Sequence, residues 1–206
     1  MKRLVPISLL ALTLMAAGAA LASPSSATVL CKNATSPCSS VYGAGTVLKA
    51  ELEVEGAWGV FPIACKESTV ELEVTNPGSG TESVSGTVNE FSLGNCNCEA
   101  LQTVVSKGKF SVGHTSGTIG ALQLSEFEVS LTLHGGAGSC APTLHCLFGT
   151  TVTGLTLEGG TTARIKSTEE ATIPKISGNS LFCLKNAPVT ADYTVVSPEP
   201  LYVLAS

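Results

Sequence analysis

Phe127-Glu-Val-Ser-Leu-Thr-Leu-His134 is the segment that decides the fold class of this chain. Its apolar residues alternate with polar ones, and this period of two places one row of side chains in a core and the other in water. Gly135-Gly-Ala-Gly138 interrupts the alternation, and Thr150–Glu158 resumes with Thr, Val and Leu. The stretch 118–157 therefore predicts two strands with a cysteine-containing connection between them.

Similar short segments recur along the chain between glycine- and proline-rich turns such as Asn76-Pro-Gly-Ser-Gly80. After residue 22, no segment of ten residues has a convincing helical period. Strands that recur about every 8–12 residues predict an all-β fold, which we expect to be an antiparallel β-sandwich or jelly-roll-like and stabilised by disulfides. The expected strands lie at 48–54, 70–75, 84–93, 101–105, 109–112, 122–133, 150–158, 163–166, 171–173, 189–196 and 201–204.

Three places in this pattern predict local irregularities. The alternation changes phase after Val84 and Val88, and Gly86 is well placed to allow a β-bulge there. A second change of phase predicts a kink or tight turn near Ser125-Glu126. Lys107-Gly108 is expected to be the turn that joins the pair 101–105 and 109–112.

The first 22 residues have the pattern of a secretory signal peptide. Lys2 and Arg3 precede a long apolar stretch, which ends in Ala20-Leu-Ala22. We therefore divide the chain into a signal peptide (1–22), an N-terminal lead tied down by a disulfide (23–45) and one β-sandwich domain (46–206). The expected location is secreted, extracellular or at the cell surface, with no membrane span after signal removal.

Charge and composition disfavour several classes of partner. Loss of Lys2 and Arg3 changes the formal net charge from −5 to −7, and the nine remaining basic residues are scattered. Nucleic-acid binding needs clustered Lys and Arg, so we expect no nucleic-acid partner. The partner itself is unknown from the sequence, with a cell-surface component or a glycan as the candidate.

All eight cysteines follow the predicted signal peptide, which indicates a framework of four disulfides. Cys31–Cys38 and Cys140–Cys146 each bracket a short loop that contains a proline. For the other four we favour Cys65–Cys183 with Cys96–Cys98, and the alternative joins Cys65 to Cys96 or Cys98. The candidate disulfide cysteines are Cys31, Cys38, Cys65, Cys96, Cys98, Cys140, Cys146 and Cys183.

Three sequence features resemble a group of exported proteins of soil actinobacteria. They are the loop Cys31-Lys-Asn-Ala-Thr-Ser-Pro-Cys38, the bracket Cys140…Cys146 that runs into Phe148-Gly-Thr150, and Tyr193-Thr-Val near Pro200-Leu-Tyr-Val203. The resemblance spans most of the chain after the signal peptide. It implies a β-rich fold with paired cysteines and an extracellular location, and it implies no activity because that group has none established.

Cysteine and histidine chemistry receives little support from the sequence. Cys96-Asn-Cys98 could form a strained ring that exchanges disulfides, but Glu90 and Glu99 are expected to disfavour a reactive thiolate. His134, Cys140, His145 and Cys146 lack the paired spacing of a zinc site. His134-Gly-Gly has no accompanying nucleophile motif. We therefore expect no catalytic residues, metal or cofactor.

Glutamates supply the alternative function. Glu51/Glu53/Glu55, Glu71/Glu73 and Glu126/Glu128 could serve a small secreted carbohydrate hydrolase that uses two facing carboxylates. Pairs on one face of one strand are more simply the solvated side of a sheet. Trp58, between glycines 56 and 59, is a candidate ligand contact or a cap on the core.

The sequence favours an exported, non-enzymatic protein with a structural or binding role. A glutamate-dependent hydrolase and a thiol–disulfide exchange protein are the alternatives.

Overall fold

The computed structural model describes residues 27–53, 56–58, 63–96, 99–134, 144–178 and 183–206. This part of the chain contains strands, turns and bends and no helix, so the all-β prediction is confirmed. The strands form a two-stranded sheet and an eleven-stranded sheet, and every pairing is antiparallel.

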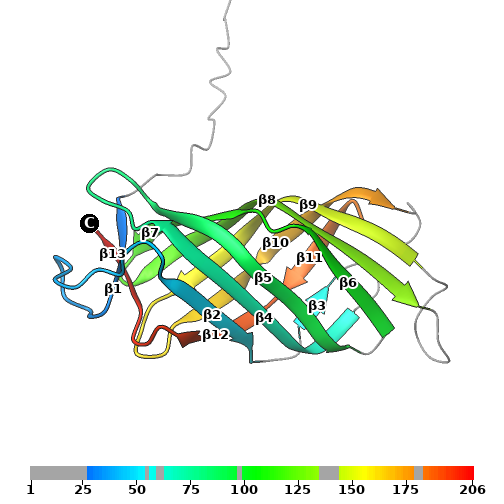
Figure 1. Cartoon of the computed structure of the whole chain (residues 1–206), viewed down its shortest axis with the longest axis horizontal. Coiled ribbons are helices and arrows are strands. Elements are labelled where there is room, and N and C mark those ends of the chain that lie inside the picture. The colour runs from blue at the N-terminus through cyan, green and yellow to red at the C-terminus, as the bar shows by residue number, and fades with distance from the viewer. Residues whose placement is uncertain (1–26, 54–55, 59–62, 97–98, 135–143, 179–182) are drawn as a thin grey trace, which may run out of the picture.

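The large sheet closes on itself as a barrel (Figure 1). Eight strands form the ring, because the pairing that runs from β5 through β7 to β2 returns through β4 to β5. The structure therefore has a closed barrel where the sequence predicted a sandwich or a jelly roll. In ring order the strands are β5 (Val84–Cys96), β7 (Lys109–Ser116), β8 (Ile119–His134), β9 (Leu144–Glu158), β10 (Arg164–Gly178), β12 (Asp192–Ser197), β2 (Val47–Leu52) and β4 (Ile63–Asn76).

Three further strands lie end to end with ring strands and extend them toward the same end of the barrel. β3 (Gly56–Trp58) and β2 both pair with β4, and β11 (Asn186–Thr190) and β12 both pair with β10. In the same way, β6 (Glu99–Ser106) and β7 both pair with β8. Each of these couples occupies one position in the wall, so the barrel is an up-and-down meander of eight long strands, three of them interrupted.

The interruption at Lys107-Gly108 corrects the predicted hairpin. Because β6 and β7 lie along the same neighbour, Lys107-Gly108 joins two collinear strands instead of reversing the chain. Gly108 has φ +71°, and a Cβ there would lie 2.5 Å from the carbonyl oxygen of Ser125. This close approach of two backbones requires glycine.

The predicted irregularity near Ser125-Glu126 is confirmed. The register of β8 against β9 shifts between Ser125 and Phe127, and Glu126 has φ +56°. In β5 the extra residue that changes the phase is Asn89, because Glu90 lies opposite Glu71 and Val88 lies opposite Leu72. A second register shift lies at Gly86 itself, because Val74 lies opposite Gly86 and Asn76 lies opposite Ser85. A Cβ at Gly86 would lie 1.9 Å from the carbonyl oxygen of Glu73, so glycine allows this close approach.

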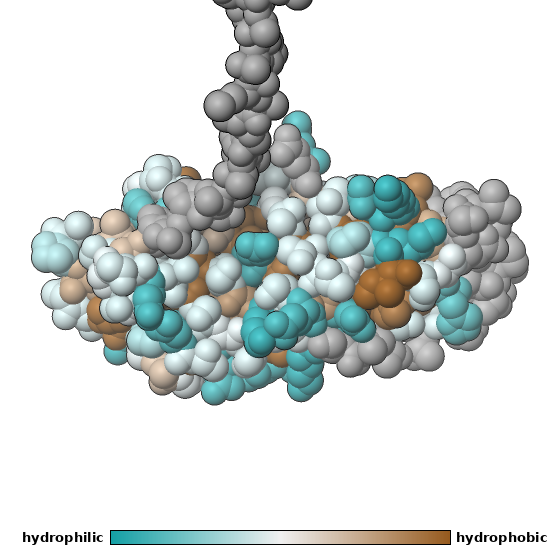
Figure 2. Space-filling view, turned by 90° about the horizontal axis from the view of Figure 1, so that it is seen from above, coloured by the Kyte–Doolittle hydropathy of each residue, from teal (hydrophilic) through white to brown (hydrophobic). Residues whose placement is uncertain are grey.

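Apolar side chains from alternate positions point into the barrel and form its core. Phe127, Val129 and Leu131 are buried, whereas Glu126 and Glu128 on the same strand point outward, as the alternation predicts. Phe91 and Phe127 meet edge to face, with ring centroids 5.5 Å apart. On the face shown in Figure 2, hydrophilic and weakly polar residues predominate, with smaller apolar areas between them.

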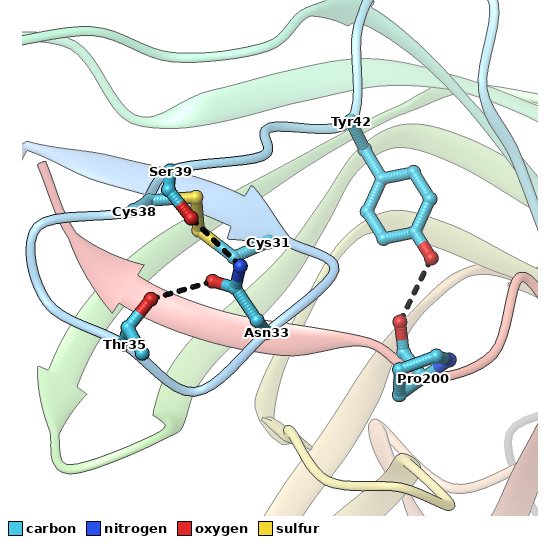
Figure 3. The surroundings of a disulfide bond; sticks show 7 residues. All are labelled: Cys31, Asn33, Thr35, Cys38, Ser39, Tyr42 and Pro200. Carbon is cyan, nitrogen blue, oxygen red and sulfur yellow. Dashed lines mark hydrogen bonds between the residues drawn. A yellow bond between two sulfur atoms is a disulfide. The ribbon is translucent and has the colours of Figure 1, made fainter.

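A ribbon of two strands covers one end of the barrel. β1 (Thr28–Cys31) pairs with β13 (Tyr202–Ala205), which confirms the predicted strand near 201–204. Leu30, Leu201 and Val203 are at most 1% exposed and belong to the barrel core. Tyr42 Oη donates to the Pro200 carbonyl at 2.8 Å beside the Cys31–Cys38 disulfide (Figure 3).

The disulfides confirm one of the four predicted pairs and correct the other three. Cys31–Cys38 is confirmed, but Cys146 bonds to Cys183 instead of Cys140. Cys65 bonds to Cys96, which was the alternative for these residues, so neither Cys65–Cys183 nor Cys96–Cys98 forms. Cys98 and Cys140 lie outside the described residues, as does the predicted signal peptide at 1–22.

Candidate ligand-binding cavity

An apolar cavity of about 50 Å³ lies inside the barrel. It is bordered from several sides, by side chains of β4, β5, β8, β9, β10, β11 and β12 and by Ala191. The lining residues are Val70, Leu72, Val88, Phe91, Leu122, Leu124, Phe127, Val152, Leu155, Ile165, Val189, Ala191 and Tyr193. Val70 and Leu124 are half-buried although they share the inward face of their strands with buried residues, because they border this space.

Tyr193 is the lining residue that carries a polar group, and its hydroxyl is turned toward Ser68. Its oxygen lies 2.8 Å from Ser68 Oγ, and Ser68 Oγ donates to the Ser92 carbonyl at 2.6 Å. Ser68 has one hydroxyl proton, so Tyr193 is the donor in the contact between them. Burial raises the pKa of Tyr193 to about 12, although the hydrogen bond with Ser68 acts in the opposite direction. The phenol that borders the cavity is therefore neutral at physiological pH.

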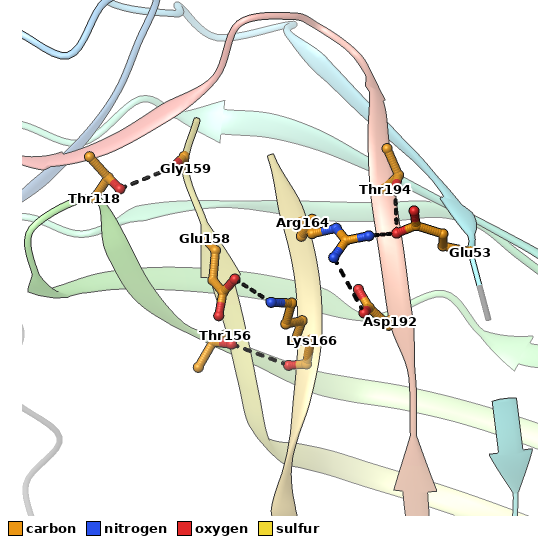
Figure 4. A network of polar contacts seen from close by, with 9 residues as sticks. All are labelled: Glu53, Thr118, Thr156, Glu158, Gly159, Arg164, Lys166, Asp192 and Thr194. Atoms are coloured by element: carbon orange, nitrogen blue, oxygen red, sulfur yellow. Dashed lines mark hydrogen bonds and ion pairs between the residues drawn. The ribbon is translucent and has the colours of Figure 1, made fainter. Parts of the chain in front are cut away.

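The glutamates proposed for a hydrolase lie on the outer wall, apart from Glu55, which is outside the described residues. Glu53 forms an ion pair with Arg164, and Asp192 lies 3.7 Å from the same guanidinium group (Figure 4). Glu73 accepts a hydrogen bond from Asn89 at 2.8 Å, and Glu126 pairs with Lys109 at 2.8 Å. None of these described carboxylates lines the cavity.

The histidine and cysteine candidates do not come together as a site in the described structure. His145 is exposed, and its Nδ1 lies 2.8 Å from Thr132 Oγ1. Its neighbour Cys146 is bonded to Cys183 and is therefore not a thiolate ligand. His134 ends β8, and Cys140 lies outside the described residues. No group of three metal-binding side chains occurs in the part of the chain that is described.

The other two candidates are only partly placed by the structure. Cys96 is bonded to Cys65, so it is not paired with Cys98 as the exchange hypothesis requires. Trp58 lies in β3, where its backbone is opposite Ile63 and Val189. The Trp58 side chain itself lies outside the described part of the structure.

A second concave region, of about 280 Å³, lies on the outer wall. Hydroxyl side chains of Thr75, Ser85, Thr87 and Ser111 border it, together with Lys109. Water competes for every polar group at such an open surface, whereas the interior cavity offers apolar surface in a closed wall. The interior is therefore the better candidate for a small-molecule site.

Sequence reasoning did not find the cavity. The alternation within the expected strand 189–196 puts Val189, Ala191, Tyr193 and Val195 on one face, and all four are buried, although β11 and β12 divide this stretch. A tyrosine within an apolar row was the available signal, since a buried phenol needs a partner. The partner, Ser68, is 125 residues away in the chain and carried no local signal.

Comparison with protein-family models, with curated proteins and with solved structures finds no match for this chain. None of the described segments forms a helix that is long and apolar enough to cross a membrane. The three described disulfides are compatible with an extracellular or otherwise oxidising compartment.

Proposed function

We propose that the protein is exported and acts outside the cell as a non-enzymatic binding protein that holds its ligand inside the barrel. The observation that carries this proposal is the apolar cavity bordered by Val70, Leu124 and Tyr193. Barrels of eight strands either fill their interior with side chains or hold one small ligand there. Space left between inward-facing side chains supports the second use.

Export is supported by two independent features. The first 22 residues have the charge and hydropathy pattern of a secretory signal peptide. The described disulfides join segments that are 7, 31 and 37 residues apart, and such crosslinks persist in oxidising compartments. The chain also resembles exported proteins of soil actinobacteria. We therefore include the surface of a bacterial cell as the place of action in this proposal.

A binding role is favoured over hydrolysis by the position of the carboxylates. A glycosidase places two carboxyl groups on either side of the bond that it breaks. Glu71, Glu73 and Glu126 instead lie on the outer wall, where Glu73 and Glu126 are bonded to Asn89 and Lys109. This arrangement is that of a solvated sheet surface.

The proposal is tested on full-length protein that is expressed in a bacterial host and recovered from the medium. We expect a mass that corresponds to residues 23–206 and no alkylation of cysteine before reduction. Native mass spectrometry should show a small molecule that is lost on denaturation, and Val70→Phe, which fills the cavity, should lack it. Retention of residues 1–22, or an empty interior that no small molecule enters, would overturn the proposal.

The hydrolase alternative is tested with the same material. Release of reducing sugar from polysaccharides should be absent, and Glu126→Gln should make no difference to that result. Hydrolysis by the wild type that is lost in Glu126→Gln would mean that the protein is an enzyme and would contradict the proposed binding function.

A further inference from the structure

We infer that the cavity takes an aliphatic chain of about four carbon atoms, either as a short neutral molecule or as the end of a longer one. This inference rests on the proposed function, since it names the class of ligand for the same interior site. It follows from the chemistry of the lining, from its size and from the charges on the adjoining wall.

The lining selects against polar ligands because it has little to offer them. Twelve of its 13 residues have purely hydrocarbon side chains, and the thirteenth is Tyr193. Its phenol already donates to Ser68, whose own proton goes to the Ser92 carbonyl. A ligand that hydrogen-bonds to water would lose those bonds on entry without an equal replacement. Hydrocarbon surface has no such bonds to lose.

Size limits the length of chain that fits. A water-sized group needs about 10–15 Å³ of a cavity measured in this way, so about 50 Å³ holds roughly four such groups. A methylene group is of similar size. Apolar cavities of this kind stay dry, so an entering chain gains contacts with Leu72, Val152 and Leu155 without displacing ordered water.

The wall beside the cavity disfavours a negative charge on the ligand. Val70 and Phe91 border the cavity from β4 and β5, and the next residues outward in register are Glu71 and Glu90, which lie directly opposite each other. Lys49 lies opposite Glu71 on β2, so the three side chains at this register carry two negative charges and one positive, and a further carboxylate would add to the negative excess. A neutral head group is therefore expected on any ligand that extends from this side.

The experiment is a titration of the purified, oxidised protein with straight-chain alcohols from ethanol to 1-octanol, followed by NMR of the valine and leucine methyl groups. Affinity should rise about fourfold for each added methylene until about four carbons are buried. A plateau beyond that length identifies the end of a longer chain, and a decline identifies a short free ligand. Alkanoates of the same lengths should bind more weakly at low salt.

Matched variants tie the binding to the cavity. Val70→Phe should reduce the affinity for 1-butanol more than tenfold. Val47→Leu adds the same methylene as Val70→Leu but at an exposed position on β2, so it should leave the whole series unchanged. Val70→Leu is the milder cavity variant and keeps the test available if Val70→Phe fails to fold. In Val70→Leu, the break in the series, which is the chain length at which affinity stops rising, should move to a shorter alcohol.

Affinity that does not depend on chain length, a preference for the alkanoates, or an unchanged break in Val70→Leu would overturn the inference. Recovery from the exported protein of a polar ligand that Val70→Phe excludes would also overturn it, but would leave the proposed function in place. An interior that accepts no molecule of any class would remove both.

Discussion

The hydroxyl of Tyr193 on β12 donates a hydrogen bond to Ser68 on β4, at 2.8 Å, inside an otherwise apolar barrel. Strand β2 lies between these two strands in the wall, so the contact joins second neighbours through the interior. The Ser68 hydroxyl in turn donates a hydrogen bond to the Ser92 carbonyl on β5, at 2.6 Å. Two consecutive hydrogen bonds therefore link strands β12, β4 and β5. Ser68 keeps a hydrogen-bond partner when the Tyr193 hydroxyl is removed, whereas Tyr193 loses its acceptor when the Ser68 hydroxyl is removed.

Removing the Tyr193 hydroxyl should reduce the free energy of unfolding less than removing the Ser68 hydroxyl does. Tyr193→Phe leaves Ser68 bonded to Ser92, and we expect a loss of about 1 kcal/mol in the free energy of unfolding. Ser68→Ala leaves a buried phenol without its acceptor, and we expect about 2–3 kcal/mol. Urea denaturation of the oxidised protein measures both values.

The double variant Ser68→Ala/Tyr193→Phe is the control for this comparison. It removes both polar groups, so its loss should be smaller than the sum of the two single losses. Equal losses in the single variants, or strict additivity in the double variant, would show that the two hydroxyls do not depend on each other.

Stability should fall at alkaline pH because of the same tyrosine. Burial raises the pKa of Tyr193 to about 12, against 10.0 for an unburied phenol. Below pH 10 the folded and unfolded states both keep the proton, and the contribution of Tyr193 to stability is intact. Between pH 10 and 12 the unfolded state releases the proton first, so the free energy of unfolding decreases as the pH rises, by about 3 kcal/mol in total.

The measurement is urea denaturation of the wild type and of Tyr193→Phe at pH 9 and at pH 11.5. Burial also raises the pKa of Tyr42, but that group is present in both proteins and its effect cancels in the comparison. The wild type should lose more stability than the variant over this range. Parallel losses in the two proteins would contradict the buried, neutral state of Tyr193.

The alternation of side chains was enough to predict an all-β structure and many of its strands, because it depends only on which face of a strand is buried. Phe127, Val129 and Leu131 occupy the inward face that their spacing indicated. The same local pattern does not say whether the last strand of a sheet pairs with the first. Closure depends on the contact of β12 with β2, which lies about 140 residues away in the chain.

The errors have the same origin. Lys107-Gly108 has the composition of a hairpin turn, and only the pairing of both flanking strands with β8 shows that the chain continues in one direction there. Short proline-containing loops suggested Cys140–Cys146, whereas the bond to Cys183 forms because β9 and β10 bring Cys146 opposite Gly178. Ser68 lies just before the expected strand 70–75, and nothing near it in the chain indicates its contact with Tyr193 on β12. Each of these features is set by long-range pairing.

Gly108 should be one of the least replaceable residues in the barrel wall. Gly108→Ala combines a positive φ with a Cβ that would lie 2.5 Å from the Ser125 carbonyl oxygen and 2.7 Å from the Phe127 nitrogen. Backbone atoms cannot move aside as a flexible side chain can. We expect a loss of about 3 kcal/mol or more in the free energy of unfolding.

Gly117→Ala is the matched control, because Gly117 also has a positive φ, of +56°, but has nothing within 4 Å of an added Cβ. It should lose only about 1–2 kcal/mol, the contribution of the backbone conformation alone. Thermal and urea denaturation of both variants test the difference. A similar loss in the two would mean that β7 and β8 separate easily at this point, and that the close approach is not a constraint.

The disulfides should differ in what they contribute, in proportion to the loop that each one closes. Cys31–Cys38 closes a separation of 7 residues and Cys65–Cys96 one of 31. The entropy of closing these loops in the unfolded chain predicts losses of about 2 and about 4 kcal/mol when each pair is replaced by alanine. Peptide mapping without reduction should first show both crosslinks in the wild type, and a thiol assay should show that the remaining cysteines stay paired in each variant. A larger loss for the Cys31/Cys38 variant would mean that this bond acts through the folded state, by holding the β1–β13 ribbon over the end of the barrel, because the short loop leaves little entropy to recover.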